Sequence, residues 1–360
     1  MLISTKFFQL VRYATGASDE KPLIEAHEWE AMFDMARKQS VMGVVYGALQ
    51  RMGKDSSIPR ELKMKWFLRV EKIKDRNRLL NQCSAELAAM FRQDGLDCCI
   101  LKGQGNALMY PDPFVRVPGD IDLQVRGGRE LILQYVKKRF PHTKTAYQPV
   151  DYPVFKNVSV EVHYLPTYMN NPVHNHRMKR WFEAQEGNMY GHDVELPNAS
   201  GMIPVPSVKF NVIFQMAHLM HHFFDEGIGL RHMLDYYYLL RKVRQENVSL
   251  NDIEDELATL GLKKFAGGVM YIMHNILGLE DDCLIVPVDK TRGETILNEM
   301  LHGGNFGKHS GLTEHSLASK HLLKYWRAMH FIGEYPSEAL CEPVFRTWHF
   351  FWRWKNTFYG

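Results

Sequence analysis

Apolar residues follow a helical period over the first quarter of the chain. Residues 24–36 and 41–52 are two such runs, and Pro59 opens a longer one that ends at Gly95. In the long run the apolar positions recur at three- and four-residue steps or their multiples, at Trp66, Val70, Ile73, Leu80, Cys83, Leu87 and Met90. Proline near a helix start and glycine at its end are typical boundary residues. The pattern therefore predicts that residues 1–96 form packed helices.

The pattern changes to short segments from residue 97 onward. A buried strand is predicted at 98–101, a glycine turn and short helix ending near 110, a strand at 119–125 and a helix at 129–139. Alternating apolar residues predict a hairpin of 152–157 with 158–164, turning at Lys156-Asn157, and one more strand at 192–196. Residues 97–200 are therefore expected to form a compact α/β core.

Helical periodicity returns after Pro206 and continues to the end of the chain. The predicted helices cover 208–224, 230–243, 250–260, 263–277, 293–301, 317–329 and 343–359, with a loop at 303–311. The layout predicts an α+β protein in three parts: an N-terminal helical region (1–96), the α/β core (97–200) and a C-terminal helical domain (201–360).

Composition narrows the class of protein. Apolar residues make up 45% and charged residues 24% of the 360 residues, as in globular proteins with a core. The net charge of +3 is too small to indicate a nucleic-acid binder by itself. Five cysteines without a C-x-x-C pair favour a reducing, cytoplasmic setting. No apolar run reaches the roughly 18 to 20 residues of a membrane span.

The candidate chemistry lies in the α/β core. Asp120 and Asp122 flank one isoleucine, so in a strand both carboxylates point to one face, and such a pair is costly without a cation. Glu161 stands between two valines in the strand at 158–164. If the two strands are neighbours, three carboxylates converge and can hold two Mg²⁺ ions, an arrangement suited to phosphoryl transfer.

These motifs resemble the DNA polymerase β-type nucleotidyltransferase superfamily, and more narrowly its bacterial uncharacterised nucleotidyltransferase family. The matching segments are Ile100-Leu101-Lys102-Gly103, Tyr110-Pro111-Asp112, Arg116, Gly119-Asp120-Ile121-Asp122-Leu123, Glu161-Val162-His163, His218, His221, Gly229-Leu230-Arg231 and Leu234-Asp235. The resemblance implies a mixed sheet backed by helices. It also implies Mg²⁺-dependent transfer of a nucleoside monophosphate from an NTP to an acceptor hydroxyl, on a small molecule or protein more readily than on RNA.

The resemblance also assigns roles to residues. Asp120, Asp122 and Glu161 are the expected metal ligands, and Glu161 matches the acid that activates the acceptor hydroxyl. Gly103 and the backbone that follows it, including Gln104, are expected to cradle the triphosphate. The cationic side chains expected to bind phosphate are Lys102, Arg116 and, if it is buried at the cleft, Arg231.

Three alternatives stay open. Gln104 stands where the superfamily usually has Ser or Gly, which favours a non-catalytic nucleotide-binding or scaffold protein on a degenerate fold. His218, His221 and His222 with Asp225 share one helical face and suggest a zinc site, or a helix packed against the cleft. The aromatic and basic residues 345–359 are interpreted as core or as a self-association surface, with a membrane or single-stranded nucleic acid as the rival partner.

Overall fold

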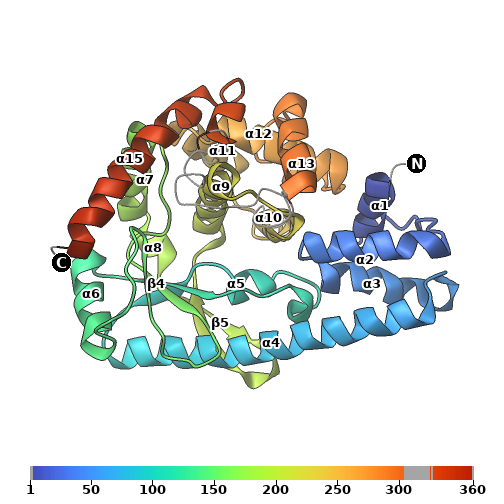
Figure 1. The fold of residues 1–360 in the computed structure, drawn as a ribbon, viewed down its shortest axis with the longest axis horizontal. Helices are drawn as coiled ribbons and strands as arrows, with labels where there is room; N and C mark the ends of the chain where they lie inside the picture. The colour runs from blue at the N-terminus through green and yellow to red at the C-terminus, as the bar shows by residue number, and fades with distance from the viewer. Residues whose placement is uncertain (1–2, 304–324, 326, 359–360) are drawn as a thin grey trace.

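The computed structural model describes residues 3–303, 325 and 327–358. Four helices precede the sheet, and the last of them is a single rod of 34 residues that runs along one side of the molecule (Figure 1). Pro59 and Gly95, which has a φ of +74°, lie at its two ends as predicted. The helices are α1 (Ile3–Thr15), α2 (Trp29–Lys38), α3 (Met42–Met52) and α4 (Arg60–Gln93).

A four-stranded mixed sheet lies between α4 and the later helices, in the strand order β1-β2-β4-β3. Strand β2 pairs antiparallel with β1 and parallel with β4, and β3 pairs antiparallel with β4. The strands are β1 (Cys98–Ile100), β2 (Ile121–Val125), β3 (Pro149–Asp151) and β4 (Val160–His163). The mixed sheet with backing helices confirms the predicted α+β class.

The hairpin of β3 and β4 differs from its prediction in the first strand. Strand β3 ends at Asp151, before the predicted segment begins. Pro153 is the second residue of that segment and has no N–H for a sheet ladder. The chain still turns where expected, because an isolated bridge joins Phe155 to Val158.

A second, two-stranded sheet is formed by β5 (His192–Leu196) and β6 (Gly201–Val205). Strand β5 confirms its prediction, whereas β6 was not predicted. Its sequence contains Gly201, which has a φ of +112°, and Pro204, both of which are depleted in strands. Strand β6 packs against α4 and β1, so the hairpin extends one side of the sheet layer.

Most of the later helices lie on the side of the sheet away from α4 (Figure 1), whereas α6 packs with the end of α4, where the Tyr135 and Phe91 ring centroids lie 4.9 Å apart. The helices after β1 are α5 (Gln104–Ala107), α6 (Gly128–Arg139), α7 (Pro172–Ala184), α8 (Glu186–Met189), α9 (Val208–Asp225), α10 (Leu230–Gln245), α11 (Leu250–Thr259), α12 (Lys263–Tyr271), α13 (Lys290–Gly303) and α15 (Pro336–Phe358). The predicted loop at 303–311 and most of the predicted helix at 317–329 lie outside the described residues. Within the described chain, no helix is both long and apolar enough to cross a bilayer.

Two hydrophobic clusters form the interior, and α4 belongs to both. Trp66 and Val70, in its first half, belong to the cluster that joins the N-terminal helices to α9, α10 and α12. Leu87 and Phe91, in its second half, pack under the sheet. Helix α4 therefore ties the helical part of the molecule to the sheet that carries the candidate chemistry.

The aromatic helix α15 is divided between packing and exposure. Phe345 stacks on Tyr168 with ring centroids 4.9 Å apart, and Trp348 meets Tyr147 edge-on at 5.4 Å. Phe350 and Phe351 are 52% and 61% exposed. One face of α15 thus packs on Tyr147 and Tyr168, although Trp348 is itself 47% exposed, and Phe350 and Phe351 lie at the surface.

Candidate active site

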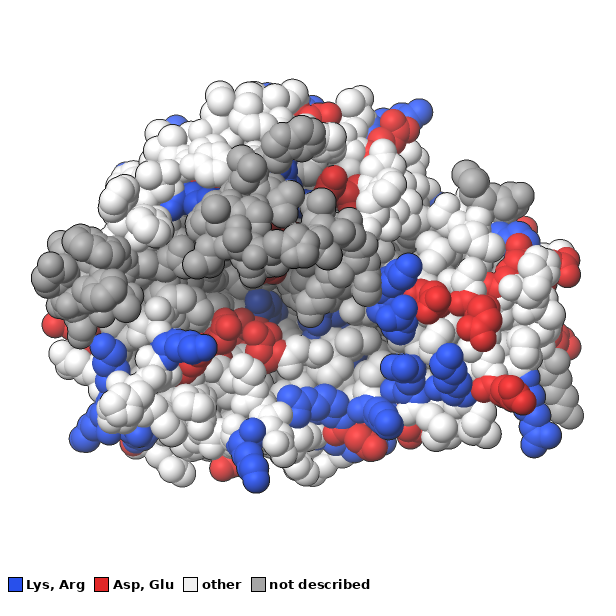
Figure 2. All heavy atoms as spheres, in the orientation of Figure 1, with Lys and Arg blue, Asp and Glu red and all other residues white. Residues whose placement is uncertain are grey.

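The parallel pairing of β2 with β4 brings the acidic residues together. Asp122 lies directly opposite Glu161, and Gln124 opposite His163. Residues paired in this way point to the same face of a sheet, and the residue two positions along points there as well. Asp122, Glu161 and His163 therefore share one face, above which acidic side chains gather on the surface near β4 (Figure 2).

Asp122 is the buried centre of this group. Its Oδ1 lies 3.1 Å from Nε2 of His163, and its Oδ2 lies 3.3 Å from Nζ of Lys102. Burial by itself would raise the pKa of Asp122, but the Lys102 ammonium and the His163 hydrogen bond outweigh it and lower that pKa. Asp122 is therefore a carboxylate at neutral pH, with a positive charge beside it.

Asp120 lies just before β2, which begins at Ile121 and not at residue 119 as predicted. Its side chain is exposed, and its pKa is raised because the Asp122 carboxylate repels a second negative charge. The structure thus places Asp120 beside Asp122 but in a more open position.

One group of side chains has the spacing of a metal site. Among the residues that the structure describes, Asp122, Glu161 and His163 offer ligand atoms that all lie within 4.8 Å of one another. Two carboxylates suit Mg²⁺ or Mn²⁺, and an imidazole also suits a transition metal. The group fits a divalent cation, with His163 beside the two carboxylates, while Asp120, the other predicted ligand, lies next to Asp122 outside this trio.

The glycine turn faces this group from the end of β1. Gly103 has φ +63° and ψ −110°, and a Cβ there would lie 3.6 Å from the backbone oxygen of Asp120. The next side chain, Gln104, is buried and donates to Asn81 on α4. The side chain of Gln104 thus points away from the acidic face, which leaves its backbone N–H for a phosphate.

Replacing Gly103 by alanine should destabilise the protein by about 1–3 kcal/mol, because its backbone conformation is one that glycine alone adopts readily. Urea denaturation measures the change. Gly47→Ala is the control, since Gly47 lies in α3 with open space around it and should gain about 0.5–1 kcal/mol. Equal stability of the Gly103→Ala protein and the wild type would refute the proposed strain.

Arg116, an expected phosphate ligand, is held in a buried ion pair. Its Nε and Nη2 each lie 2.7 Å from an oxygen of Asp235, which also accepts from the Tyr110 hydroxyl at 2.6 Å. Arg231 donates to the backbone oxygen of Val117 at 3.3 Å. Arg231 also lines a small cavity of about 50 Å³ together with Lys102 and both aspartates.

The histidines of α9 extend the network behind Lys102. Nε2 of His218 lies 3.0 Å from Nζ of Lys102 and 3.0 Å from Nε2 of His222. Burial, then the Lys102 charge, lowers the pKa of His218 well below its ordinary value, so its neutral ring can accept from Lys102. These contacts favour the interpretation that α9 packs against the cleft, and they disfavour the interpretation that its histidines form a zinc site.

Sequence reasoning missed the contacts of Lys102 with Asp122 and His218, and the role of Tyr110. The signal for Lys102 was its position next to the glycine turn. No local pattern indicated its partner on α9, which is 116 residues away. Tyr110 was noted only as part of a motif, and its Asp235 partner is 125 residues away.

The mixed sheet backed by helices is the fold expected of a nucleotidyltransferase, and on it the paired acids of adjacent strands face a glycine turn. The chain belongs to the uncharacterised nucleotidyltransferase family, whose model matches residues 25–278. That range includes every residue of the acidic face.

Other comparisons are more distant. A crystal structure of an antigenic nucleotidyltransferase-like protein from Paracoccidioides brasiliensis is similar at 12% identity and a TM-score of 0.31, over 51% of this chain and 93% of that one. A likeness of this size adds no argument about function. No curated protein matches the sequence.

Proposed function

We propose that this protein is a metal-dependent nucleotidyltransferase that moves a nucleoside monophosphate from an NTP to an acceptor hydroxyl. The observation that carries the proposal is the register of β2 and β4, which sets Asp122 against Glu161 with His163 beside them. Membership of the nucleotidyltransferase family supports the same reaction class.

Each residue of the site has a role in this reaction. Asp122 and Glu161, with Asp120 or His163, would hold the divalent cations, which when bound neutralise phosphate charge and align the reacting oxygens. The backbone after Gly103 and the cations of Lys102 and Arg231 would bind the triphosphate. Arg116 would instead fix the shape of the cleft through Asp235.

Glu161 is the candidate general base. Its side chain is 32% exposed, in contrast to 3% for Asp122, so an acceptor can reach it. Its Oε2 lies 3.5 Å from Nε2 of His163, whose N–H can hold the Glu161 carboxylate in place while it takes the proton of the acceptor hydroxyl.

A non-catalytic nucleotide-binding protein is the second candidate. Gln104 buries its side chain, and Lys102 already supplies a cation to Asp122, so the site is partly neutralised by the chain itself. Calorimetry with NTP and Mg²⁺ separates a non-catalytic nucleotide-binding protein from a scaffold that has lost its nucleotide site, because only the first would bind NTP.

Transfer is tested with each NTP carrying a labelled α-phosphate, incubated with cell lysate, Mg²⁺ and the purified protein. We expect one class of acceptor to gain label, and Glu161→Gln to lower the rate by roughly 10²- to 10⁴-fold, the size of a general-base contribution. The control is Glu186→Gln, because Glu186 is an exposed glutamate paired with Arg126. Binding of NTP without any labelled product would favour the scaffold.

A further inference from the structure

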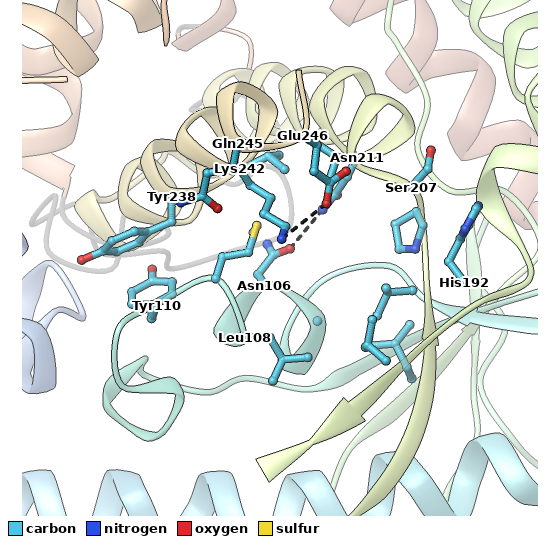
Figure 3. A pocket seen from close by; sticks show the side chains of 18 of the residues that line it. Asn106, Leu108, Tyr110, His192, Ser207, Asn211, Tyr238, Lys242, Gln245 and Glu246 are labelled. Atoms are coloured by element: carbon cyan, nitrogen blue, oxygen red, sulfur yellow. Dashed lines mark hydrogen bonds and ion pairs between the residues drawn. The ribbon is translucent and has the colours of Figure 1, made fainter. Parts of the chain in front are cut away.

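A second, larger cavity lies beside the acidic site, on the other side of α5. It has a volume of about 830 Å³ and is enclosed by the β1–α5 segment, the β5–β6 hairpin and the facing helices α9 and α10 (Figure 3). Cavities of roughly 300–1,000 Å³ are the usual size for small-molecule sites. This cavity could not be predicted from the sequence, because its walls come from four separate segments.

The charges that line the cavity balance one another. They come from two cations, Arg241 and Lys242, and two carboxylates, Glu195 and Glu246. Lys242 lies 3.4 Å from Glu246, and Arg241 lies 3.4 Å from Glu280. Both cations thus have a carboxylate partner, and an anionic ligand would have to break these pairs in a site that also presents Glu195.

Uncharged polar groups and flat apolar surface make up the rest of the lining. Gln245 offers an exposed amide, Asn106 and Asn211 contribute amides that are also bonded to one another, and Lys242 extends from α10 toward Asn106 (Figure 3). Tyr110 and Tyr238, whose ring centroids lie 4.4 Å apart, form an aromatic corner. Amide groups beside aromatic rings recognise hydroxyls and the faces of a ring.

Asn106 connects this cavity to the acidic site, because it lines both. Its Oδ1 accepts from Gln215 at 3.0 Å and from Asn211 at 3.4 Å. The small cavity at Asp120 and Asp122 has a volume of about 50 Å³, enough for water or part of a phosphate but not for an organic molecule. A whole organic molecule next to the acids must therefore extend elsewhere.

We propose that the larger cavity binds an uncharged, hydroxyl-bearing ring compound. Two sources share that chemistry: the nucleoside part of the NTP and a sugar-like or cyclitol acceptor. The assignment rests on the shape and charge balance of the cavity and stands whether or not the protein catalyses nucleotidyl transfer.

Saturation-transfer NMR on the full chain tests the proposal with adenosine, guanosine, cytidine, uridine, glucose and myo-inositol as probes, without metal. We expect at least one probe to bind, and Val208→Trp to weaken it by about tenfold or more. Val208 lines the cavity at the start of α9 and is partly exposed. The matched control, Val173→Trp, changes a valine that is 56% exposed on α7 and should bind as the wild type does.

Gln245→Trp is the second blocking variant, in case Val208→Trp does not fold, because Gln245 lines the cavity from an exposed position on α10. Binding of nucleosides alone would assign the cavity to the donor, and binding of glucose or inositol alone to the acceptor. The proposal would be overturned if no probe binds, if neither blocking variant weakens binding, or if inorganic pyrophosphate displaces the probe.

Discussion

An Asp122→Asn protein should fold as the wild type does and transfer nucleotide roughly 10³-fold more slowly, or not at all. Asp122 has the lowest exposure of the acids on the sheet face, at 3%, and touches both Lys102 and His163. Asparagine keeps the size of the side chain but removes the charge that a divalent cation and Lys102 both use. Losses of this order follow when one group that stabilises transition-state charge is removed.

The assay is transfer of labelled α-phosphate, with circular dichroism as the check of folding. Asp97→Asn is the matched control, since Asp97 lies directly before β1 in an exposed pair with Arg126, an arrangement that contributes little stability. Transfer at the wild-type rate by the folded Asp122→Asn protein would remove Asp122 from the proposed mechanism.

An Asp235→Ala protein should lose about 3–5 kcal/mol of unfolding free energy. Arg116 and Asp235 have side chains that are 5% and 6% exposed, and they meet through two hydrogen bonds of 2.7 Å. Burial would raise the pKa of Asp235, but Arg116 outweighs it and lowers that pKa. Without the carboxylate, a buried guanidinium is left unpaired, which costs far more than the net contribution of an intact pair.

Urea denaturation measures this loss as a lower midpoint. A triple variant, Tyr110→Phe with Arg116→Met and Asp235→Leu, separates the pair from the packing around it. It removes both charges and the hydroxyl that donates to Asp235 at 2.6 Å, so most of the stability should return. If the triple variant were as unstable as Asp235→Ala, the loss of unfolding free energy would come from altered packing and not from the unpaired buried charge.

Much of the fold could be predicted because the relevant signals are local. The period of Trp66 and Val70, with Pro59 and Gly95 as boundaries, was enough to find α4. The first strand of the hairpin was placed too late because Val154 and Phe155 look like strand residues while Pro153 prevents a ladder. Strand β6 was missed because pairing with β5 overrides the weak strand propensity of Gly201 and Pro204.

The candidate site was predictable where neighbouring strands carry the residues. Asp122 and Glu161 stand out as acids within apolar strands, and their pairing needs only that the two strands be adjacent. The partners of the cations were not predictable, because Lys102 meets His218 and Arg116 meets Asp235 across more than a hundred residues of sequence. The sequence shows that these side chains are cationic, but it does not show whether each one pairs with a bound phosphate or with a carboxylate of the protein.

Helix α4 limits which fragments of this chain can fold by themselves. Its first half is part of the helical interior and its second half is the floor of the sheet, with Trp66 and Phe91 both fully buried. A fragment that starts at residue 97 would keep every acid of the site and lose the apolar surface on which β1 and β2 rest. The smallest working piece of this protein must therefore include a helix that carries none of its chemistry.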